Sequence, residues 1–382
     1  MAYKKYFVYK KQISEDGGRT WEDTDPLETT TSGDPIATYD TLEECENPFY
    51  LTIVPHQNGE LKFSARGNYY IEYDYSVDSG HTWSSATSET IIPLVSGDKV
   101  MFKGELTADY QEGVYWNGIG TFSASTPFDA EGNPMSLLFG EDFSDKKSLA
   151  GKVNAFGHMF HGSSIVNAEN LILPATVLSE MCYSSMFFDC ASLVTTPQLV
   201  ATNLSGATGC YIYMFGACTS LTTAPELIAT ELSVSCYGGM FAGCTSLTTA
   251  PELPATVIYE ASYQGMFSGC TSLTTAPEIL PAMVLEDSCY DLMFKNCTSL
   301  RKAPELPASG SGSADWCYGE MFRGCSSLNE ITCLLTYPNF ITGLWVVGVS
   351  SSGTFTKAAN STYWDDLDGD SGIPTGWSVR TK

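Results

Sequence analysis

Cysteine is the residue type in this chain with the widest possible chemistry, because a thiol can form disulfides, hold zinc or act as a nucleophile. The 382-residue sequence contains 13 cysteines, and most of them recur at two fixed places in a repeated pattern. The first column is Cys182, Cys210, Cys236, Cys289 and Cys317, and the second is Cys190, Cys218, Cys244, Cys270, Cys297 and Cys325.

The spacing of these cysteines argues against bonding between the columns. Cys236 and Cys244 are eight residues apart, which on a helix separates their Cα atoms by about 12 Å. A disulfide needs Cα atoms within roughly 7 Å, and the Cys-x-x-Cys spacing of zinc sites does not occur. We therefore expect buried, reduced thiols that pack as small apolar side chains. Cys45 and Cys333 lie outside the columns, and the sequence assigns them no role.

Three alternating aspartates, Asp366, Asp368 and Asp370, look like the start of a calcium-binding loop. The EF-hand pattern fails, however, because Ser371 stands in place of its sixth-position glycine and Trp377 in place of its last glutamate. A looser cation site remains open at this loop.

A second acidic group is a column of glutamates beside two columns of threonines. The glutamates are Glu226, Glu252, Glu278 and Glu305, and the threonines are Thr222, Thr248 and Thr274 with Thr223, Thr249 and Thr275. At a strand spacing of about 4.8 Å, neighbouring carboxylates would repel by only about 1 kcal/mol in water. A solvated face is the simpler interpretation, and a sugar-binding or cation-bridged ridge is the alternative.

No arrangement of residues typical of catalysis accompanies these columns. His158 and His161 stand three residues apart without a third metal ligand. The sequence has no glycine-rich phosphate loop, no Gly-x-Ser-x-Gly motif and no Cys–His nucleophile pair. We expect a protein without enzymatic activity, cofactor or bound metal.

The pattern Ser-x-Asp-x-Gly-x-Thr-Trp occurs twice, at residues 14–21 and 76–83. Its defining residues are Asp16, Gly18 and Trp21 in the first copy and Asp78, Gly80 and Trp83 in the second. The aspartate should tie the loop backbone, the glycine should adopt positive φ, and the tryptophan should pack beneath. The pattern resembles the Asp boxes of sialidase propellers, but a propeller needs several blades. Two copies favour a structural hairpin turn over a glycosidase site.

The cysteines belong to a repeat that must position all these columns. Its Met-Phe pair begins at Met159, Met186, Met214, Met240, Met266, Met293 and Met321, with spacings of 27, 28, 26, 26, 27 and 28 residues. Such a period is typical of a stacked repeat architecture. The predicted core comprises Met240, Phe241 and Cys244 in one unit and Met266, Phe267 and Cys270 in the next.

The spacing within one unit predicts its local structure. Cys236, Met240, Phe241 and Cys244 fall at i, i+4, i+5 and i+8, which predicts one face of a short helix. An extended segment should follow, because Pro251 prevents helix there. The predicted fold is a solenoid with a strand ladder on one side and helices on the other.

The motif Met-Phe-x-x-Cys-x-Ser-Leu-x-x-x-Pro-x-Leu-Pro-Ala-Thr resembles the BspA-like leucine-rich repeats of surface proteins of gut Bacteroides-type bacteria and of proteins of their phages. The resemblance covers roughly residues 150–335, under half of the chain. It implies a repeat solenoid and a binding or adhesion role rather than catalysis.

The rest of the chain predicts a multidomain, β-rich protein. We expect an N-terminal β attachment region at 1–48, an immunoglobulin-like β-sandwich at 49–126 and a linker with an N-terminal cap at 127–158. The seven-repeat α/β solenoid should span 159–334, and a C-terminal β cap or module should follow at 335–382, opening with a hairpin over residues 344–357.

Charge limits the partners of this protein. The formal charge is −25, and residues 153–294 contain no Lys or Arg, so nucleic acid is excluded as a partner. The sequence shows neither an 18-residue apolar run nor a signal-like start. A phage virion protein is the favoured interpretation, because virion components need no export signal.

We expect a fibre-like tail or capsid appendage that is exposed on the particle, and a homo-oligomer is compatible with this role. It would attach to other virion proteins through its N-terminal domains and bind a host-surface glycan or protein. The alternatives are a bacterial surface adhesin, a purely structural decoration protein and, more remotely, a glycan-cleaving appendage.

Overall fold

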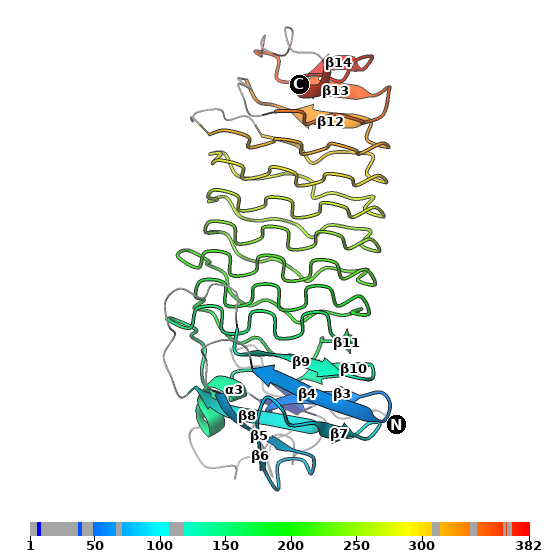
Figure 1. Cartoon of the computed structure of the whole chain (residues 1–382). Helices are drawn as coiled ribbons and strands as arrows, with labels where there is room; N and C mark the ends of the chain where they lie inside the picture. The colour runs from blue at the N-terminus through cyan, green and yellow to red at the C-terminus, as the bar shows by residue number, and fades with distance from the viewer. Residues whose placement is uncertain are drawn as a thin grey trace.

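The computed structural model describes residues 6–8, 37–39, 49–65, 71–106, 118–307, 314–336, 342–361, 364 and 369–382. Over these ranges the chain is β-rich, with several open sheets and a single short α-helix, α3 (Ser136–Phe139). The molecule is elongated, with a sheet region at one end and a long stack of coils that leads to the C-terminus (Figure 1).

The sheet region contains two larger sheets. One has six strands in the order β11 (Ile165–Asn167), β10 (Phe128–Glu131), β3 (Leu51–Pro55), β8 (Val100–Leu106), β5 (Ile71–Ser76) and β6 (Ser84–Ala86). The other has three strands in the order β7 (Ile92–Leu94), β4 (Gly59–Ala65) and β9 (Gly120–Ala124). Separately, β1 (Tyr6–Val8) pairs with β2 (Ala37–Tyr39), and the 3-10 helix η2 (Gly140–Phe143) follows α3.

Aromatic rings fill the space between these two sheets. Phe63 of β4 meets Tyr73 of β5 with ring centroids 5.0 Å apart, and Phe102 of β8 meets Phe122 of β9 at 4.9 Å. All four side chains are buried, because alternate residues of a strand point to the same face. The two sheets are therefore packed face to face.

The sheet region continues directly into the coil stack. β10, which lies in the expected linker at 127–158, pairs antiparallel with β3 and parallel with β11. The ring of Phe122 stacks on that of Phe160 in the first coil, 5.7 Å away. One continuous hydrophobic core runs through both parts.

The coils contain turns where the sequence predicts helices. In the segment at 236–244, the Met240 amide donates to the Tyr237 carbonyl at 3.2 Å, and the next amide, of Phe241, donates to Met266 in the following coil at 2.9 Å. An α-helix would instead bond each amide to the residue four before it. The helix prediction is wrong, because alternate amides bond within the coil and between coils.

A positive φ at every fourth residue produces this backbone. Ser235, Gly239 and Gly243 have φ of 54°, 58° and 76°, and the equivalent residues of other coils repeat the pattern. The chain therefore runs as a wave of period four, which points residues i, i+1, i+4, i+5 and i+8 inward. A helix of period 3.6 buries almost the same set, so burial spacing alone does not separate the two structures.

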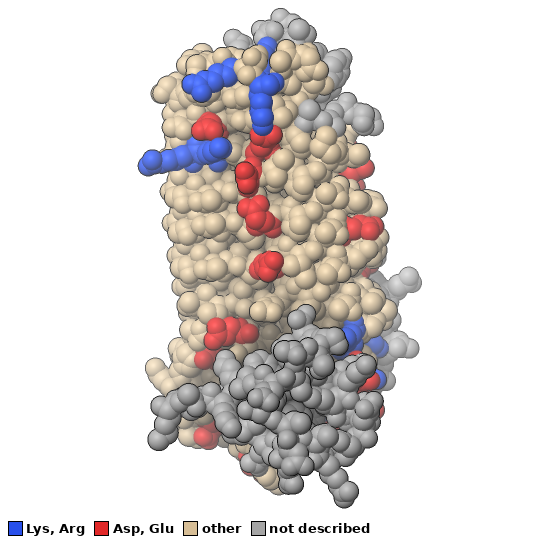
Figure 2. Space-filling view, turned by 180° about the vertical axis from the view of Figure 1, so that it is seen from behind, with Lys and Arg blue, Asp and Glu red and all other residues tan. Residues whose placement is uncertain are grey.

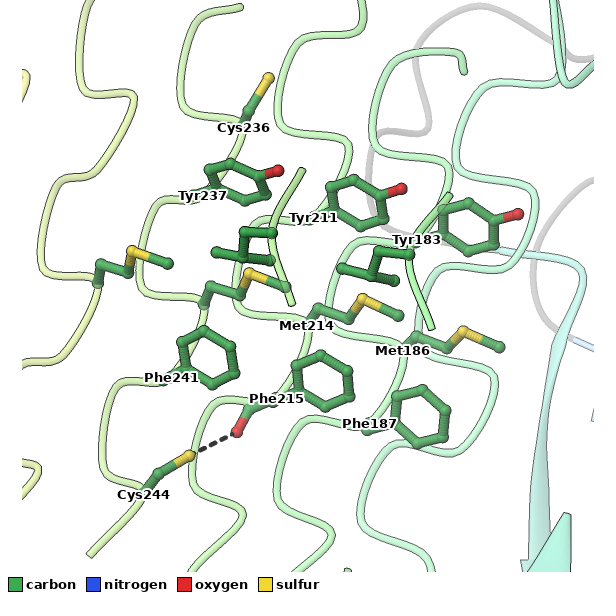
Figure 3. Close-up of a cluster of buried hydrophobic side chains, with 14 of the residues drawn as sticks. Tyr183, Met186, Phe187, Tyr211, Met214, Phe215, Cys236, Tyr237, Phe241 and Cys244 are labelled. Atoms are coloured by element: carbon green, nitrogen blue, oxygen red, sulfur yellow. Dashed lines mark hydrogen bonds between the residues drawn. The ribbon is translucent and has the colours of Figure 1, made fainter. Parts of the chain in front are cut away.

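The inward side chains form straight columns along the stack (Figure 3). Neighbouring rings of the Tyr and Phe columns lie 5.4–5.9 Å apart with interplanar angles of 5–26°. The six residues that the sequence assigns to the core, Met240, Phe241, Cys244, Met266, Phe267 and Cys270, have 0% exposure.

The second cysteine column ties each coil to the preceding one. Cys244 Sγ donates to the carbonyl of Phe215 at 3.1 Å (Figure 3). Each equivalent thiol makes the same bond at 2.8–3.1 Å, and these thiols belong to Cys190, Cys218, Cys270, Cys297 and Cys325. Each of these carbonyls also accepts an amide of its own coil, as Phe215 does from Cys218 at 3.2 Å. The thiol is therefore a second donor to the same oxygen, and it comes from the next coil.

The extended side of the coils forms only part of the expected strand ladder. Between β11 and β12 (Glu330–Cys333), isolated parallel bridges join the extended sides of the described coils. Examples are the bridges of Thr249 with Thr275 and of Ile279 with Glu305. Prolines such as Pro251 interrupt this side, because proline has no amide proton to donate to a ladder.

The C-terminal segment extends the stack, and the expected hairpin is wrong. β13 (Thr354–Lys357) pairs parallel with both β12 and β14 (Ser378–Thr381). The Phe322 amide donates to the carbonyl of Trp345 at 2.8 Å, as the Phe294 amide does to that of Met321, so buried Trp345 takes the column position of a methionine. A 3-10 helix, η4 (Gly369–Ser371), precedes β14.

Candidate binding surfaces of the coil stack

The coil stack presents two regular surfaces that could contact a ligand. The Thr–Glu face lies on the extended side and comprises Thr222, Thr248, Thr274, Glu226, Glu252, Glu278 and Glu305. The turn face is formed by the side chains that point outward from the four-residue waves, two from each wave. Both surfaces repeat from coil to coil, so any ligand would meet equivalent groups at regular intervals.

The threonines of the Thr–Glu face are exposed, but the structure already uses part of their hydrogen-bonding capacity. The amide and Oγ1 of Thr274 both donate to the carbonyl of Thr248, at 2.9 and 3.1 Å. This bond orients the hydroxyl along the stack and leaves its oxygen as an acceptor toward solvent.

The carboxylates of this face form a single row along the stack. Figure 2 shows acidic side chains in line along the stack, with basic side chains near the C-terminal end. Glu226, Glu252 and Glu278 are exposed, whereas Glu305 accepts a hydrogen bond from Lys382 Nζ at 2.6 Å. An exposed ion pair of this kind contributes little stability. The carboxylate oxygens of this row can accept hydrogen bonds from hydroxyl groups, such as those of a sugar.

The second Asp box forms a closed turn in the sheet region. Asp78 Oδ1 accepts hydrogen bonds from the Thr82 amide at 2.9 Å and from Ser76 Oγ at 2.7 Å. The hydroxyl and amide of Thr82, followed by Ser76, lower the pKa of Asp78 to about 2. Gly80 has φ of 84°. These bonds hold the aspartate within the turn.

Trp83 of the same box packs into the sheet region. Its ring meets that of Tyr50 edge-on at 4.9 Å, and Lys103 Nζ lies 4.3 Å from its ring centroid. The carboxylate of Glu141 accepts from both Tyr50 and Lys103. Each of these side chains contacts at least one other, so together they form a packed cluster.

Several candidate residues fall outside the described part of the chain. Asp16, Gly18 and Trp21 of the first Asp box lie there, as do Cys45, Asp366 and Asp368. Within the described ranges, no group of three or more His, Cys, Asp or Glu side chains is arranged to hold a metal ion.

His158 and His161 lie together at the first coil. Their ring centroids are 5.3 Å apart, and the His161 ring stacks on Phe188 at 5.4 Å and 7°. The two histidines therefore begin an aromatic row on the turn face.

The cysteines are placed as packing groups rather than as nucleophiles. All twelve in the described residues, Cys333 included, are free thiols and buried. Burial raises the pKa of Cys190 to about 11 and those of Cys244 and Cys333 to about 12. At neutral pH these thiols are protonated, and the thiol is a poor nucleophile and metal ligand.

Two exposed aromatic residues on the turn face are not predicted by the sequence motifs. Tyr213 is 44% exposed and Trp316 is 49% exposed. Their ring atoms lie above glycines of the next coil, Gly239 and Gly343 respectively. A glycine one repeat after an outward aromatic residue is a sequence signal that could have identified both.

Comparison with known proteins found no matching family model, no matching curated protein and no matching solved structure. In the described residues, no helix has the length and apolar character needed to cross a membrane.

Proposed function

We propose that this chain is a non-enzymatic phage virion protein, a fibre-like appendage of the tail or capsid that displays its coil stack for host-surface binding. The observation that carries this proposal is the single core that runs from the sheets to the last coil. Such a core makes a stiff arm (Figure 1), and a stiff arm can hold repeated surface groups away from the body that anchors it.

In this proposal the coils form a solenoid of the leucine-rich-repeat class, because their sequence motif resembles the BspA-like repeat. The leucine of the Cys-x-Ser-Leu motif is buried in every coil that contains it, as Leu221, Leu247 and Leu273 illustrate. In this proposal, turns replace the helical side of the repeat.

The surface chemistry supports a role in binding. The Thr–Glu face offers ordered hydroxyl and carboxylate oxygens, and residues 153–294 present no cation. Nucleic acid therefore fits this surface poorly. A host glycan or protein fits better, and the sheet region with residues 1–48 would attach to other virion proteins.

The buried thiols support assembly in a reducing compartment, as expected for a virion built in a host cytoplasm. Protonated thiols that donate to backbone carbonyls stabilise the coils only while they stay reduced. The same feature argues against the alternative of an exported bacterial adhesin.

Electron cryomicroscopy of the native particle tests the proposal. We expect density for the sheet region docked on the particle and for the coil stack pointing outward. Density buried among capsid or tail subunits would replace the proposal with a structural role. Absence from any particle, together with detection on bacterial cells, would replace it with an adhesin.

A cell-binding assay tests the display function separately. The purified chain, labelled on an added terminal tag, should bind host cells and fail to bind a strain stripped of surface polysaccharide and protein. Equal retention on both strains would refute specific host-surface binding.

A further inference from the structure

Tyr213 and Trp316 stand on the turn face in a conformation that costs free energy. Their φ values are 53° and 58°, in the left-handed region that disfavours residues with a Cβ. In several other coils the equivalent positions hold glycine or small polar residues, such as Gly239 and Ser185 for the tyrosine and Gly209 and Ser235 for the tryptophan. The fold therefore does not require an aromatic residue at either position.

Both rings rest on surfaces that only glycine can provide. A Cβ at Gly239 would lie 2.1 Å from the Tyr213 ring, and a Cβ at Gly343 would lie 2.7 Å from the Trp316 ring. A Cβ at Gly319 would also meet Trp316, at 2.6 Å. Each ring is thus held against the next coil while nearly half of its side chain stays exposed.

Hydrogen-bonding groups lie between the two rings. Gln264 Nε2 donates to Asp291 Oδ2 at 3.0 Å, and Asp291 Oδ1 lies over Gly319, beside Trp316. The buried Tyr column from Tyr211 to Tyr318 spans the same four steps, with ring spacings of 5.4–5.9 Å. The aromatic positions are therefore about 23 Å apart along the stack.

We infer that Tyr213, Gly239, Gln264, Asp291 and Trp316 form a binding track for a neutral oligosaccharide. The C–H faces of two sugar rings would pack on Tyr213 and Trp316. Sugar hydroxyls between them would bond to the amide of Gln264 and the carboxylate of Asp291. The inference rests on the proposed function and names the chemical class of the host-surface ligand.

The form of the track favours a glycan over a protein partner. A protein interface buries about 800 Å² per partner around a contiguous apolar centre, whereas these two rings are separated by glycine and polar residues. The absence of Lys and Arg from residues 153–294 disfavours an anionic glycan beside Tyr213. A neutral chain that is long and thin matches both properties.

Calorimetric titration of the full chain with neutral glucan and mannan oligosaccharides of increasing length tests this inference. Affinity should rise with length until one molecule spans both rings and then level off. Tyr213→Ala and Trp316→Ala should each weaken binding about tenfold, the effect of about 1.4 kcal/mol. The inference would be overturned if neither the glucan nor the mannan series bound to the chain. It would also be overturned if both variants bound with unchanged affinity.

Matched variants separate the loss of a ring from the loss of the fold. Tyr259, 40% exposed and outside the track, supplies the control Tyr259→Ala, which should bind like the unmodified chain. Tyr213→Phe should keep the affinity, whereas Tyr213→Leu should lose it while keeping apolar bulk. Full affinity in Tyr213→Leu would contradict a stacking role, even if Tyr213→Ala folds poorly.

Binding to whole host cells distinguishes this inference from the proposed function. Reduced cell binding by Tyr213→Ala and Trp316→Ala would support both. Unchanged cell binding by these variants would refute the track alone and leave host-surface binding in place. Oligosaccharide binding without cell binding would support the track and refute the proposed function.

Discussion

The sheet region and the coil stack bury aromatic side chains in two different ways. Between the sheets, rings meet at widely different angles, from 38° for Phe63 with Phe122 to 84° for Phe63 with Tyr73. In the stack, neighbouring Phe and Tyr rings lie within 5–26° of parallel. The sheets bring together residues of different types, whereas each coil places the same residue on its own counterpart.

The two regions also differ in how far apart in the sequence their interacting segments lie. A strand of the sandwich depends on partners that are distant in sequence, such as β3 with β8 and β10. A coil depends on the coils next to it, so the stability of the stack should approximate a sum over neighbouring interfaces. We therefore expect the two regions to respond differently to the same kind of perturbation.

Alkaline pH should have the largest effect and should act most strongly on the stack. Burial raises the pKa of Cys190 to about 11 and that of Cys244 to about 12, from an ordinary 9.0. The unfolded chain loses these protons first. The stabilisation that the buried, protonated thiols provide is therefore complete below about pH 9 and is lost as pH rises toward about 12. Urea unfolding measured between about pH 8 and 11 should show a falling midpoint.

Hydrogen exchange during the same titration should locate the effect. Amides in the coils should lose protection before those of β3 and β8, because every cysteine among the described residues lies at residue 182 or later. A constant midpoint over this pH range would contradict the burial of the thiols.

Phe267→Ser should have the next largest effect. The side chain is fully buried between Phe241 and Phe294, with ring spacings of 5.7 and 5.5 Å. Its loss should cost about 3–5 kcal/mol in the free energy of unfolding, measured by urea denaturation. The control Val284→Ser, at a site 58% exposed, should change little. An unchanged Phe267→Ser transition would refute the stacked core.

Cys244→Val should have a smaller effect that isolates one bond between coils. Valine keeps the apolar volume but cannot donate to the carbonyl of Phe215, so stability should fall by about 1 kcal/mol. Cys244→Ser retains a donor and provides the comparison. If valine leaves the unfolding midpoint unchanged, the thiol contributes packing alone.

Acidification should have the smallest effect and should act on the sheet region. The pKa of Asp78 is lowered to about 2, so its contribution is present above its ordinary 3.8 and is lost as pH falls through about 2. Carboxyl titration by NMR should give this midpoint, with the Thr82 amide shifting in parallel. An ordinary Asp78 titration would refute the bonds of the turn.

The repeat sequence predicts which residues are buried but not the path of the backbone. Met240, Phe241 and Cys244 fall on one face in a helix and equally in a wave of period four. The distinguishing signal is glycine spacing, since Gly239 and Gly243 stand four apart where a helix would gain nothing from glycine. The helix prediction is wrong because it depends only on the residues that point inward, whereas the glycines point outward.

Other features depend on how one coil meets the next, which a single repeat does not reveal. Trp345 breaks the Met-Phe pattern, so the sequence gives no sign that the stack continues beyond residue 335. The support of Tyr213 by Gly239 becomes visible only when the two coils are aligned. By contrast, the Asp78 turn is contained within eight residues, so its pattern could be interpreted directly.

The alternating amide bonds have a mechanical consequence. The bonds between coils, such as those of Phe241 with Met266 and Phe267 with Met293, run along the axis of the stack. A pull on the C-terminus along this axis would open one interface at a time, so the coils would peel off successively. A sideways force on the turn face would load every interface of the arm together. An arm of this kind yields gradually under tension and resists shear as a unit.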